Sequence, residues 1–440
     1  MKTPIVDFIK NYNKSNPVRV HMPAHKGKVN GFDVTEIQGA DSLFDANSII
    51  KESEENLASL YNSLFSVYST EGCSLCIKTA VALIDKYAKS LGKKTLIWAF
   101  RNAHRSFVDA LALCNVEVKW LFDKNSVLSC QISPSQIDEM LNSAHELPTA
   151  IYLTSPDYLG NQAPIKEIGN VCKKHNVLLV VDNAHGAYLN FLSQNQHPLY
   201  LGADICCDSA HKTLCALTGG AYLHVNKNFD FFNIQTVKNT MKIFASTSPS
   251  YLILYSLDKT NKFLFDNKNA INTCAEKVEK LKKNLTEFGY SFVGDEKLKL
   301  TIDCKKYGYT GTEIAQILQK QNIYVEYFDS DYLVFMFSPF NKQRDYKKIT
   351  KILSKIKRKT QIEPITFEFP EPIRKMSVRG AYFSNNQLVD LDLCQDKILS
   401  SAVISCPPAI PILVGGEVIS KDAIKILKHY NVKKCYIVKE

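Results

Sequence analysis

Three apolar runs in the sequence each end in polar side chains that could do chemistry. The run ADICC leads into CDSAHKT, residues 207–213, in which a lysine stands directly behind a histidine. Because ligands bind at the carboxyl ends of the strands in an open parallel sheet, we expect the polar residues after these runs to gather at one edge. They are Asp182 and His185 after VLLVV, Asn102 and His104 after TLIWAF, and Ser209, His211 and Lys212 after ADICC.

A fourth segment, STEGCS at residues 69–74, places a glycine in a turn before the helix-like sequence LCIKTAVALIDKYAKSL. Backbone N–H groups at such a helix start bind phosphate. A phosphate cradle, a lysine and a buried aspartate together fit pyridoxal 5′-phosphate, with Lys212 forming the Schiff base and Asp182 pairing with the protonated ring nitrogen. Taken singly, Lys212 could be a solvated lysine and Asp182 a helix cap, so the prediction depends on the combination.

The elements that must position these residues come from a chain of 440 residues, long enough for two or three domains. Apolar runs alternate with helical stretches between about residues 50 and 235, which predicts a doubly wound α/β domain with a mostly parallel sheet. The expected strands are 95–100, 116–122, 149–155, 177–182 and 203–209. The predicted parts are an extended N-terminal arm (1–45), a large cofactor-binding α/β domain (46–235), a helical connection (236–270), a small α+β domain (271–360) and a C-terminal α+β module (361–440).

Composition excludes several classes of protein. No apolar run reaches the roughly 18 residues that a membrane span needs, and the N-terminus shows no secretion signal, so we expect a cytoplasmic protein without a membrane partner. The 13 cysteines are scattered, which favours free thiols in a reducing compartment over disulfides. Cys73 and Cys76 form a CxxC without a second ligand pair, so no metal site is expected.

The net charge of +10 arises largely in the segment 342–359. Tyr346, Ile349, Leu353 and Ile356 fall at helical spacing in this segment, which predicts a surface helix with one buried stripe. No nucleic-acid-binding module accompanies the basic residues, so we expect no nucleic-acid partner.

The sequence resembles the Orn/Lys/Arg decarboxylases, bacterial enzymes that use pyridoxal phosphate and have the aspartate-aminotransferase fold, also called fold type I. The shorter members, which lack a response-regulator-like wing domain, are the closer match. The matching segments occur in order along the chain: HMPAHKG (21–27), DVTEIQGADSLF (33–44), LYNSLFSVYSTEGCSLC (60–76), RNAHRSF (101–107), YLTSPDYLGN (152–161), VDNAHGAYLNF (181–191), LGADICCDSAHKTL (201–214) and CPPAIPILVGGE (406–417).

The resemblance implies a role for each matching residue. Lys212 would be the Schiff-base lysine and Asp182 the partner of the ring nitrogen. His104 would stack on the ring, and His185 would reach its phenolic oxygen. The implied phosphate turn is Gly72, Cys73 and Ser74, with Ser209 and His211 adding contacts to phosphate or substrate.

The implied reaction is decarboxylation of a basic L-amino acid, with arginine favoured over lysine or ornithine, to agmatine, cadaverine or putrescine. Lys212 or His211 would deliver the proton that replaces the carboxylate. Three acidic residues could hold the distal cation of the substrate, although each could equally be a solvated or capping carboxylate: Glu36, Asp41 and Glu71.

The sequence departs from the family's motifs in two places near the site. The segment after the lysine reads LTGGAYLH (217–224), where a Thr-Gln-Ala/Ser stretch is common, and Cys73 stands where a hydroxyl or small residue is common. The fold and the cofactor are compatible with both changes.

Two other functions share most of these residues. An aminotransferase or an amino-acid lyase of fold type I would use the same lysine and aspartate, but an aminotransferase grips the substrate carboxylate with a small-domain arginine. Residues 271–340 contain no arginine, which leaves Arg374 and Arg379 as candidates. A cofactor-binding protein without turnover is the third alternative.

The resemblance also implies at least a homodimer, since fold-type-I sites are completed by a neighbouring subunit. The N-terminal arm, with His21 and His25, is the segment that could reach a partner's site.

Overall fold

The computed structural model describes residues 1–123, 126, 128–363, 371–405 and 409–439. By internal packing the chain divides into two units whose segments alternate along the sequence. The first unit comprises 1–97, 137–152 and 164–269, and the second comprises 98–136, 153–163 and 270–440. The residues predicted to bind the cofactor lie in the first unit, except for His104, which lies in the second. The five-part division predicted from the sequence stays a prediction.

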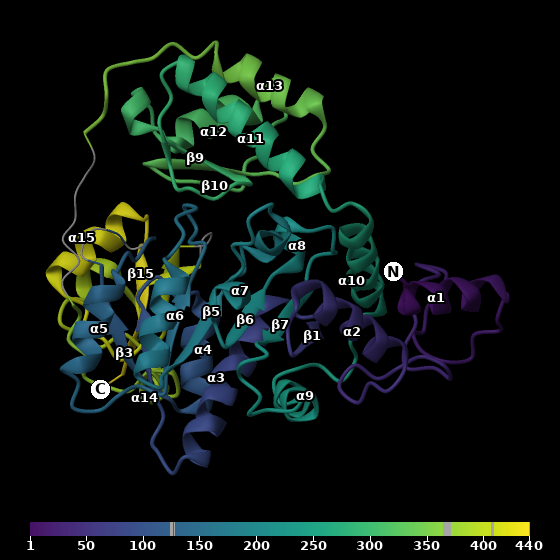
Figure 1. Cartoon of the computed structure of the whole chain (residues 1–440). Coiled ribbons are helices and arrows are strands. Elements are labelled where there is room, and N and C mark those ends of the chain that lie inside the picture. The colour runs from purple at the N-terminus through teal and green to yellow at the C-terminus, as the bar shows by residue number, and fades with distance from the viewer. Residues whose placement is uncertain (124–125, 127, 364–370, 406–408, 440) are drawn as a thin grey trace. The chain divides into compact units, whose positions relative to one another are not determined.

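Helices and strands alternate through most of the chain (Figure 1). The strands are β1 (Phe65–Ser69), β2 (Leu96–Phe100), β3 (Glu117–Leu121), β4 (Ala150–Thr154), β5 (Leu178–Asp182), β6 (Ile205–Asp208), β7 (Ala221–Val225), β8 (Phe292–Val293), β9 (Lys299–Asp303), β10 (Tyr327–Phe328), β11 (Tyr332–Met336), β12 (Asn386–Asp390), β13 (Val403–Ser405), β14 (Ile410–Leu413) and β15 (Lys434–Val438). The helices are α1 (Pro4–Lys14), α2 (Ile49–Tyr61), α3 (Gly72–Ser90), α4 (Arg105–Cys114), α5 (Pro134–Asn142), α6 (Ile165–Lys174), α7 (Pro198–Leu201), α8 (Ala210–Thr213), α9 (Ile234–Lys242), α10 (Tyr251–Asp266), α11 (Ala270–Glu287), α12 (Gly311–Gln319), α13 (Gln343–Leu353), α14 (Val378–Tyr382) and α15 (Lys421–His429), with 3₁₀ turns η1 (Ala187–Phe191), η2 (Lys305–Tyr307) and η3 (Leu391–Leu393).

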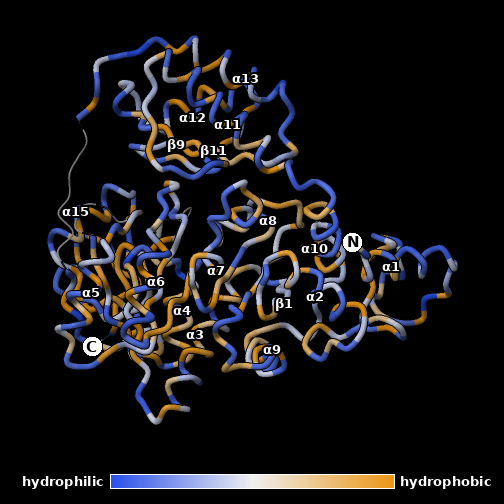
Figure 2. Tube along the Cα trace, viewed as in Figure 1, coloured by the Kyte–Doolittle hydropathy of each residue, from blue (hydrophilic) through white to orange (hydrophobic). Residues whose placement is uncertain are grey.

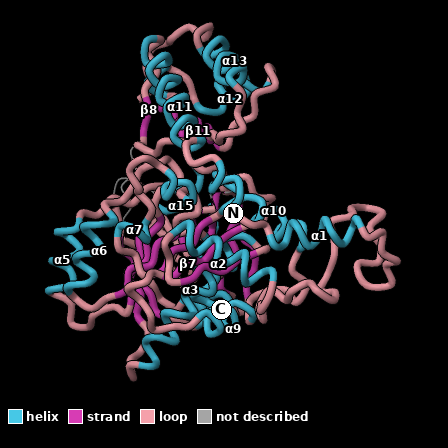
Figure 3. The backbone as a smooth tube through the Cα atoms, turned by 45° about the vertical axis from the view of Figure 1, so that its right-hand side comes forward, coloured by secondary structure: helices cyan, strands magenta, loops and turns pink. Residues whose placement is uncertain are grey.

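Among the described residues, a seven-stranded, mostly parallel sheet has the order β1-β7-β6-β5-β4-β2-β3, which is the α/β sheet that the sequence predicted. Figure 3 shows its strands side by side with helices around them. Strands β5 and β6 are parallel neighbours, and Asp182 pairs with Cys207 in their register. All the residues of both strands are buried, as expected for strands covered on both faces. This register brings the ends that carry Asp182 and Lys212 next to each other.

Helices of the first unit pack on the strands β1, β5, β6 and β7 of the same unit. Helix α3 packs on β1, β6 and β7, and its apolar face buries Leu75, Ile77, Val81 and Ile84, among others. Helix α6 packs on β5. Figure 2 colours much of the chain near α3 as hydrophobic. The start of α3 is thereby fixed at the end of β1, where the sequence places the turn STEGCS.

The second unit contains a four-stranded sheet of order β10-β11-β9-β8 and two small antiparallel pairs, β12 with β15 and β13 with β14. The basic segment forms α13, and Tyr346, Ile349 and Leu353 are its buried residues, as predicted. Ile356, the fourth residue of the predicted stripe, is buried but lies beyond the end of the helix. Residues 364–370, at the predicted start of the C-terminal module, and 406–408, at the start of the motif CPPAIPILVGGE, lie outside the described residues.

The N-terminal arm differs from the prediction, because α1 makes its first part helical rather than extended. Pro4 occupies the first turn, where its missing N–H costs nothing, and Ile5, Val6 and Ile9 form a buried face. The backbone N–H of Val6 donates to Asp258 on α10 over 3.0 Å. The weak periodicity of the arm as a whole masked this short helix. No helix of the described chain is long and apolar enough to cross a membrane.

Candidate active site

Lys212 lies on the short helix α8, directly after β6. Its Nζ atom is 3.1 Å from Nε2 of His185, which follows β5. The neighbouring His211 donates from Nδ1 to the carbonyl oxygen of Gly220 over 3.1 Å, because a carbonyl can only accept. Ser209, the residue that precedes α8, is buried. The two strand ends therefore bring together the lysine and one of the predicted histidines.

Asp182 ends β5 and is 1% exposed. Its Oδ1 accepts from the backbone N–H of Ala184 over 3.1 Å, and its Oδ2 accepts from the hydroxyl of Tyr152 over 3.3 Å. The thiol of Cys73, in the first turn of α3, lies 4.0 Å from Oδ1. Burial raises the pKa of Asp182 to about 6, and the opposing effect of Lys212 is smaller. The aspartate thus lies close to the first turn of α3, and the charge of Lys212 acts on its pKa.

The segment predicted to bind the phosphate, called the phosphate turn below, begins with a glycine at the start of α3. Gly72 has a φ of +72°, and a Cβ at this position would meet nothing within 4 Å, so open space faces the first turn of the helix. The backbone N–H of Gly72 donates to Gly219 over 2.7 Å. Gly219 has a φ of +96°, and a Cβ there would lie 2.9 Å from the carbonyl oxygen of Thr70. A side chain at position 219 would collide with Thr70, so a glycine is needed where the LTGG segment passes close to the phosphate turn.

These residues fit pyridoxal phosphate. An uncovered helix start suits a phosphate, a lysine amine suits an aldehyde, and a buried carboxylate suits a protonated ring nitrogen. Cys73 and Ser74 belong to the same first turn as Gly72. Helix α3 has 19 residues, so its N-terminal dipole favours an anion.

The three acidic candidates for the substrate cation differ in their surroundings. Both carboxylate oxygens of Asp41 accept backbone N–H groups at the start of α2, from Asn47, Ser48 and Ile50 at 2.9–3.0 Å, which favours a capping role. Glu71 is exposed and accepts the backbone N–H of Ser246 over 2.7 Å. Glu36 is also exposed.

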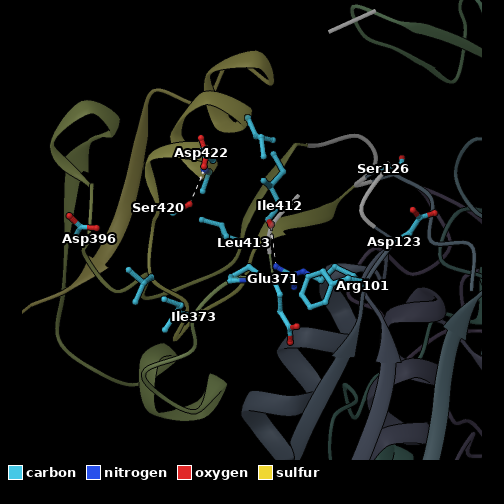
Figure 4. Close-up of a pocket in the computed structure, with 15 residues that line it drawn as sticks. Arg101, Asp123, Ser126, Glu371, Ile373, Asp396, Ile412, Leu413, Ser420 and Asp422 are labelled. Carbon is cyan, nitrogen blue, oxygen red and sulfur yellow. Dashed lines mark hydrogen bonds between the residues drawn. The ribbon is translucent and has the colours of Figure 1, made fainter. Parts of the chain in front are cut away.

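His104 and the arginine of the same motif are held within the second unit. His104 precedes α4 and its Nδ1 accepts the backbone N–H of Ser106 over 3.1 Å. Arg101 is 7% exposed and donates to Glu417 over 2.9 Å and to the carbonyl oxygen of Ile412 over 3.1 Å. Figure 4 shows Arg101 and Ile412 among the residues that line a cavity of about 330 Å³. The motifs RNAHRSF and ILVGGE are thus joined by a buried ion pair.

Sequence reasoning missed Tyr152, although it lies within a predicted strand. It is fully buried, and burial together with the nearby Asp182 raises the pKa of its hydroxyl well above the usual value, so the hydroxyl remains a donor. A tyrosine in an otherwise aliphatic buried strand is a signal that could have identified it. The candidates Arg374 and Arg379 donate to the backbone carbonyls of Val118 and of Ala112, respectively.

The family model for the major domain of Orn/Lys/Arg decarboxylases matches residues 3–294. The chain belongs to the Orn/Lys/Arg decarboxylase family. The arginine decarboxylase of Bacillus subtilis (strain 168) is 25% identical over 466 residues, covering 97% of this chain and 93% of that protein. The arginine decarboxylase of Halalkalibacterium halodurans is 26% identical over 472 residues, covering 98% of this chain and 94% of that protein.

Solved decarboxylase structures share the fold. The constitutive lysine decarboxylase of E. coli has a TM-score of 0.79 at 16% identity, covering all of this chain and 82% of that chain. Lysine decarboxylase A from Pseudomonas aeruginosa has a TM-score of 0.78 at 14% identity, covering 99% of this chain and 80% of that chain. The fold is therefore fold type I, and this family member is a decarboxylase that depends on pyridoxal phosphate.

Proposed function

We propose that the protein decarboxylates L-arginine in preference to L-lysine and L-ornithine, and that Lys212 carries the cofactor. The observation that carries the proposal is the pairing of β5 and β6, which sets Asp182 and Lys212 at neighbouring strand ends beside His185. Relatives named arginine decarboxylase, matched along almost the whole chain, support the preference for arginine.

In the proposed reaction, pyridoxal phosphate supplies an electron sink for the electrons left when carbon dioxide departs. The chain holds the cofactor at two charged ends: Asp182 pairs with the ring nitrogen, and the first turn of α3 with Gly72, Cys73 and Ser74 binds the phosphate. His104 would stack on the ring, His185 would contact its phenolic oxygen, and Ser209 would add a phosphate contact. Each of these roles follows from the family motifs and from the residue types.

Proton transfer falls to Lys212 or His211. His185 lies 3.1 Å from Lys212 Nζ and can exchange a hydrogen bond with it, so the amine can be held as a base or as an acid. His211 is oriented by its bond to Gly220, which directs its Nε2 away from that carbonyl. Replacement of the lost carboxylate by a proton gives the amine product.

The substrate's distal cation needs a carboxylate. Glu71 is the strongest of the three candidates because it adjoins the phosphate turn and is not buried in a helix cap, in contrast to Asp41. Glu36 remains the second candidate. A Glu71→Gln variant with a raised KM and an unchanged kcat would support this assignment.

We infer at least a homodimer in the cytoplasm. Val18, Val20 and Val29 in the N-terminal arm are each more than 80% exposed, and a partner subunit would cover such apolar side chains. His21 and His25 lie in the same arm. Analytical ultracentrifugation of the full chain tests this, with a monomer as the contradicting result.

The function is tested by offering L-arginine, L-lysine and L-ornithine separately to the cofactor-loaded protein and measuring both carbon dioxide and amine. Agmatine formed fastest supports the proposal. Cadaverine or putrescine formed faster would correct the substrate, and transfer of the amino group without carbon dioxide would favour an aminotransferase.

A further inference from the structure

A second buried carboxylate, Asp208, ends β6 and is fully buried. Its Oδ2 lies 2.9 Å from Nε2 of His197 and 3.4 Å from Nε2 of His224. Its Oδ1 accepts the side-chain amide of Asn183 over 2.7 Å and the thiol of Cys206 over 3.3 Å. All four neighbours are buried. Asp208 lies four residues before Lys212, and a fully buried carboxylate with this many hydrogen-bonding neighbours is expected to have a structural or functional role.

The hydrogen bonds around His197 decide what kind of cluster this is. The backbone N–H of Leu199 donates to Nδ1 of His197 over 3.3 Å, so Nδ1 carries a lone pair and Nε2 carries the hydrogen. That hydrogen points to Asp208, and a metal at the same place would need a lone pair instead. His197, Asp208 and His224 have the residue types and spacing of a metal site, but the bond from Leu199 favours a hydrogen-bonded carboxylate.

Asp208 is ionised in this cluster. Burial acts to raise its pKa, but the two histidines outweigh burial and lower the pKa below the usual value. Burial also lowers the pKa of His224, so that ring is neutral at neutral pH. The cluster therefore holds a carboxylate in the interior whose stability depends on the buried groups that donate hydrogen bonds to it.

The charge is coupled to the cofactor end of the site through Asn183. Asn183 follows Asp182 directly, and its backbone N–H donates to Cys207 over 2.9 Å while its side chain donates to Asp208. A Cβ on Gly186 would lie 1.9 Å from the side-chain oxygen of Asn183, so the turn is closed around this amide. Burial raises the pKa of Asp182 most, Lys212, the backbone N–H of Ala184 and the hydroxyl of Tyr152 lower it, and the charge of Asp208 adds to the rise. The thiol of Cys73 lies 4.0 Å from Oδ1 of Asp182.

We propose that Asp208 is a positioning residue for the cofactor, which holds the turn after Asp182 in place through its hydrogen bond with Asn183. The inference rests on the proposed binding of pyridoxal phosphate between Lys212 and Asp182. Neither His197 nor Asp208 touches the reacting atoms, so their effect is on cofactor affinity and its pH dependence.

The test measures the dissociation constant of pyridoxal phosphate for the full chain at several pH values. Asp208→Asn removes the charge and replaces one acceptor oxygen by an N–H donor, so the bonds to Asn183 and His197 cannot both be kept, and binding is expected to weaken about tenfold or more at neutral pH. Without Asp208 the pKa of Asp182 falls, so the loss of cofactor at acid pH should also move to lower pH. A general loosening of the fold would weaken cofactor binding but would leave the pH at which the cofactor is lost unchanged.

A second pair of variants keeps the test decisive if Asp208→Asn does not fold. His197→Gln retains a donor toward Asp208 and should bind cofactor within about twofold of the wild type, whereas His197→Leu should weaken binding as Asp208→Asn does. The control is Asp138→Asn, which weakens a His–Asp bond of similar length, 2.7 Å, between His175 and the partly exposed Asp138. It should leave cofactor affinity unchanged.

Three results would overturn the inference: unchanged affinity in Asp208→Asn, equal weakening in His197→Gln and His197→Leu, or stoichiometric zinc in the purified wild type that Asp208→Asn loses. Failure of the proposed function would look different. A wild type that binds cofactor but forms no amine would remove the proposed substrate and leave the Asp208 test intact.

Discussion

Nζ of Lys212 lies 3.1 Å from Nε2 of His185, although 27 residues separate them in the chain. The parallel register of β5 and β6 produces this contact, because it aligns the ends of the two strands. An amine with a histidine neighbour can lose and regain a proton without bulk water. In the proposed function, one side chain would therefore both anchor the cofactor and transfer the proton.

Replacing Lys212 by alanine should reduce amine formation to below about a thousandth of the wild-type rate, since the group that anchors the cofactor and moves the proton is gone. Lys212→Arg keeps the positive charge and should be equally inactive. Amine release is the readout, and thermal melting of both variants checks that they fold. A Lys212→Ala variant that retains a tenth of the activity would exclude Lys212 as the anchor.

Cofactor affinity should fall as the pH drops through about 6. Burial raises the pKa of Asp182 to about 6, and pairing with the protonated ring nitrogen needs the ionised carboxylate, so protonation of Asp182 competes with binding. Equilibrium dialysis from pH 8 to pH 5 measures the effect. Asp182→Asn should bind weakly at every pH and lack this step. The same step in Asp182→Asn would assign it to the cofactor phosphate.

Gly219→Ala should weaken cofactor binding, because its Cβ would lie 2.9 Å from the carbonyl oxygen of Thr70 and displace the phosphate turn. Gly92→Ala is the matched control. Gly92 also has a positive φ, +68°, but a Cβ there meets nothing within 4 Å. Both substitutions strain the backbone by about 1–2 kcal/mol. The account is therefore supported only if Gly219→Ala loses more cofactor affinity than Gly92→Ala. Equal affinities would contradict it.

Glu417→Gln should destabilise the second unit by about 3–5 kcal/mol, because it leaves the buried Arg101 without its ion-pair partner. Urea unfolding followed by tryptophan fluorescence is suitable, since both tryptophans, Trp98 and Trp120, lie in this unit and Trp120 is 4.9 Å from Arg101. Glu313→Gln, at a half-exposed pair with Lys359, should change stability by less than about 0.5 kcal/mol. Similar effects of the two substitutions would show that burial of the pair is unimportant.

The predicted segments 95–100, 116–122, 149–155, 177–182 and 203–209 each contain a strand, because these strands are continuous apolar runs. The remaining strands of the described seven-stranded sheet, β1 and β7, were not predicted. Lys212 and Asp182 could be singled out because chemically distinctive residues follow such runs. Helix α1 was missed because only its first half is buried, within a polar arm.

Contacts between segments that are far apart in the chain could not be predicted from the sequence. The hydroxyl of Tyr152 reaches Asp182 from another strand, and His197 reaches Asp208 from a loop, so neither pair has a spacing that a pattern can reveal. The capping role of Asp41 is likewise visible only from its three backbone partners. Patterns report which face of an element is buried, whereas side-chain partners depend on how the elements pack.

The central claim is that Lys212 carries the cofactor in a decarboxylase, and reductive trapping tests it most directly. The purified, cofactor-loaded protein is treated with borohydride, digested, and its modified peptide identified by mass spectrometry. The account predicts a single modified residue, Lys212, with Asp182→Asn giving less of the same product. Modification of a different lysine, or of none in protein that forms amine, would contradict it.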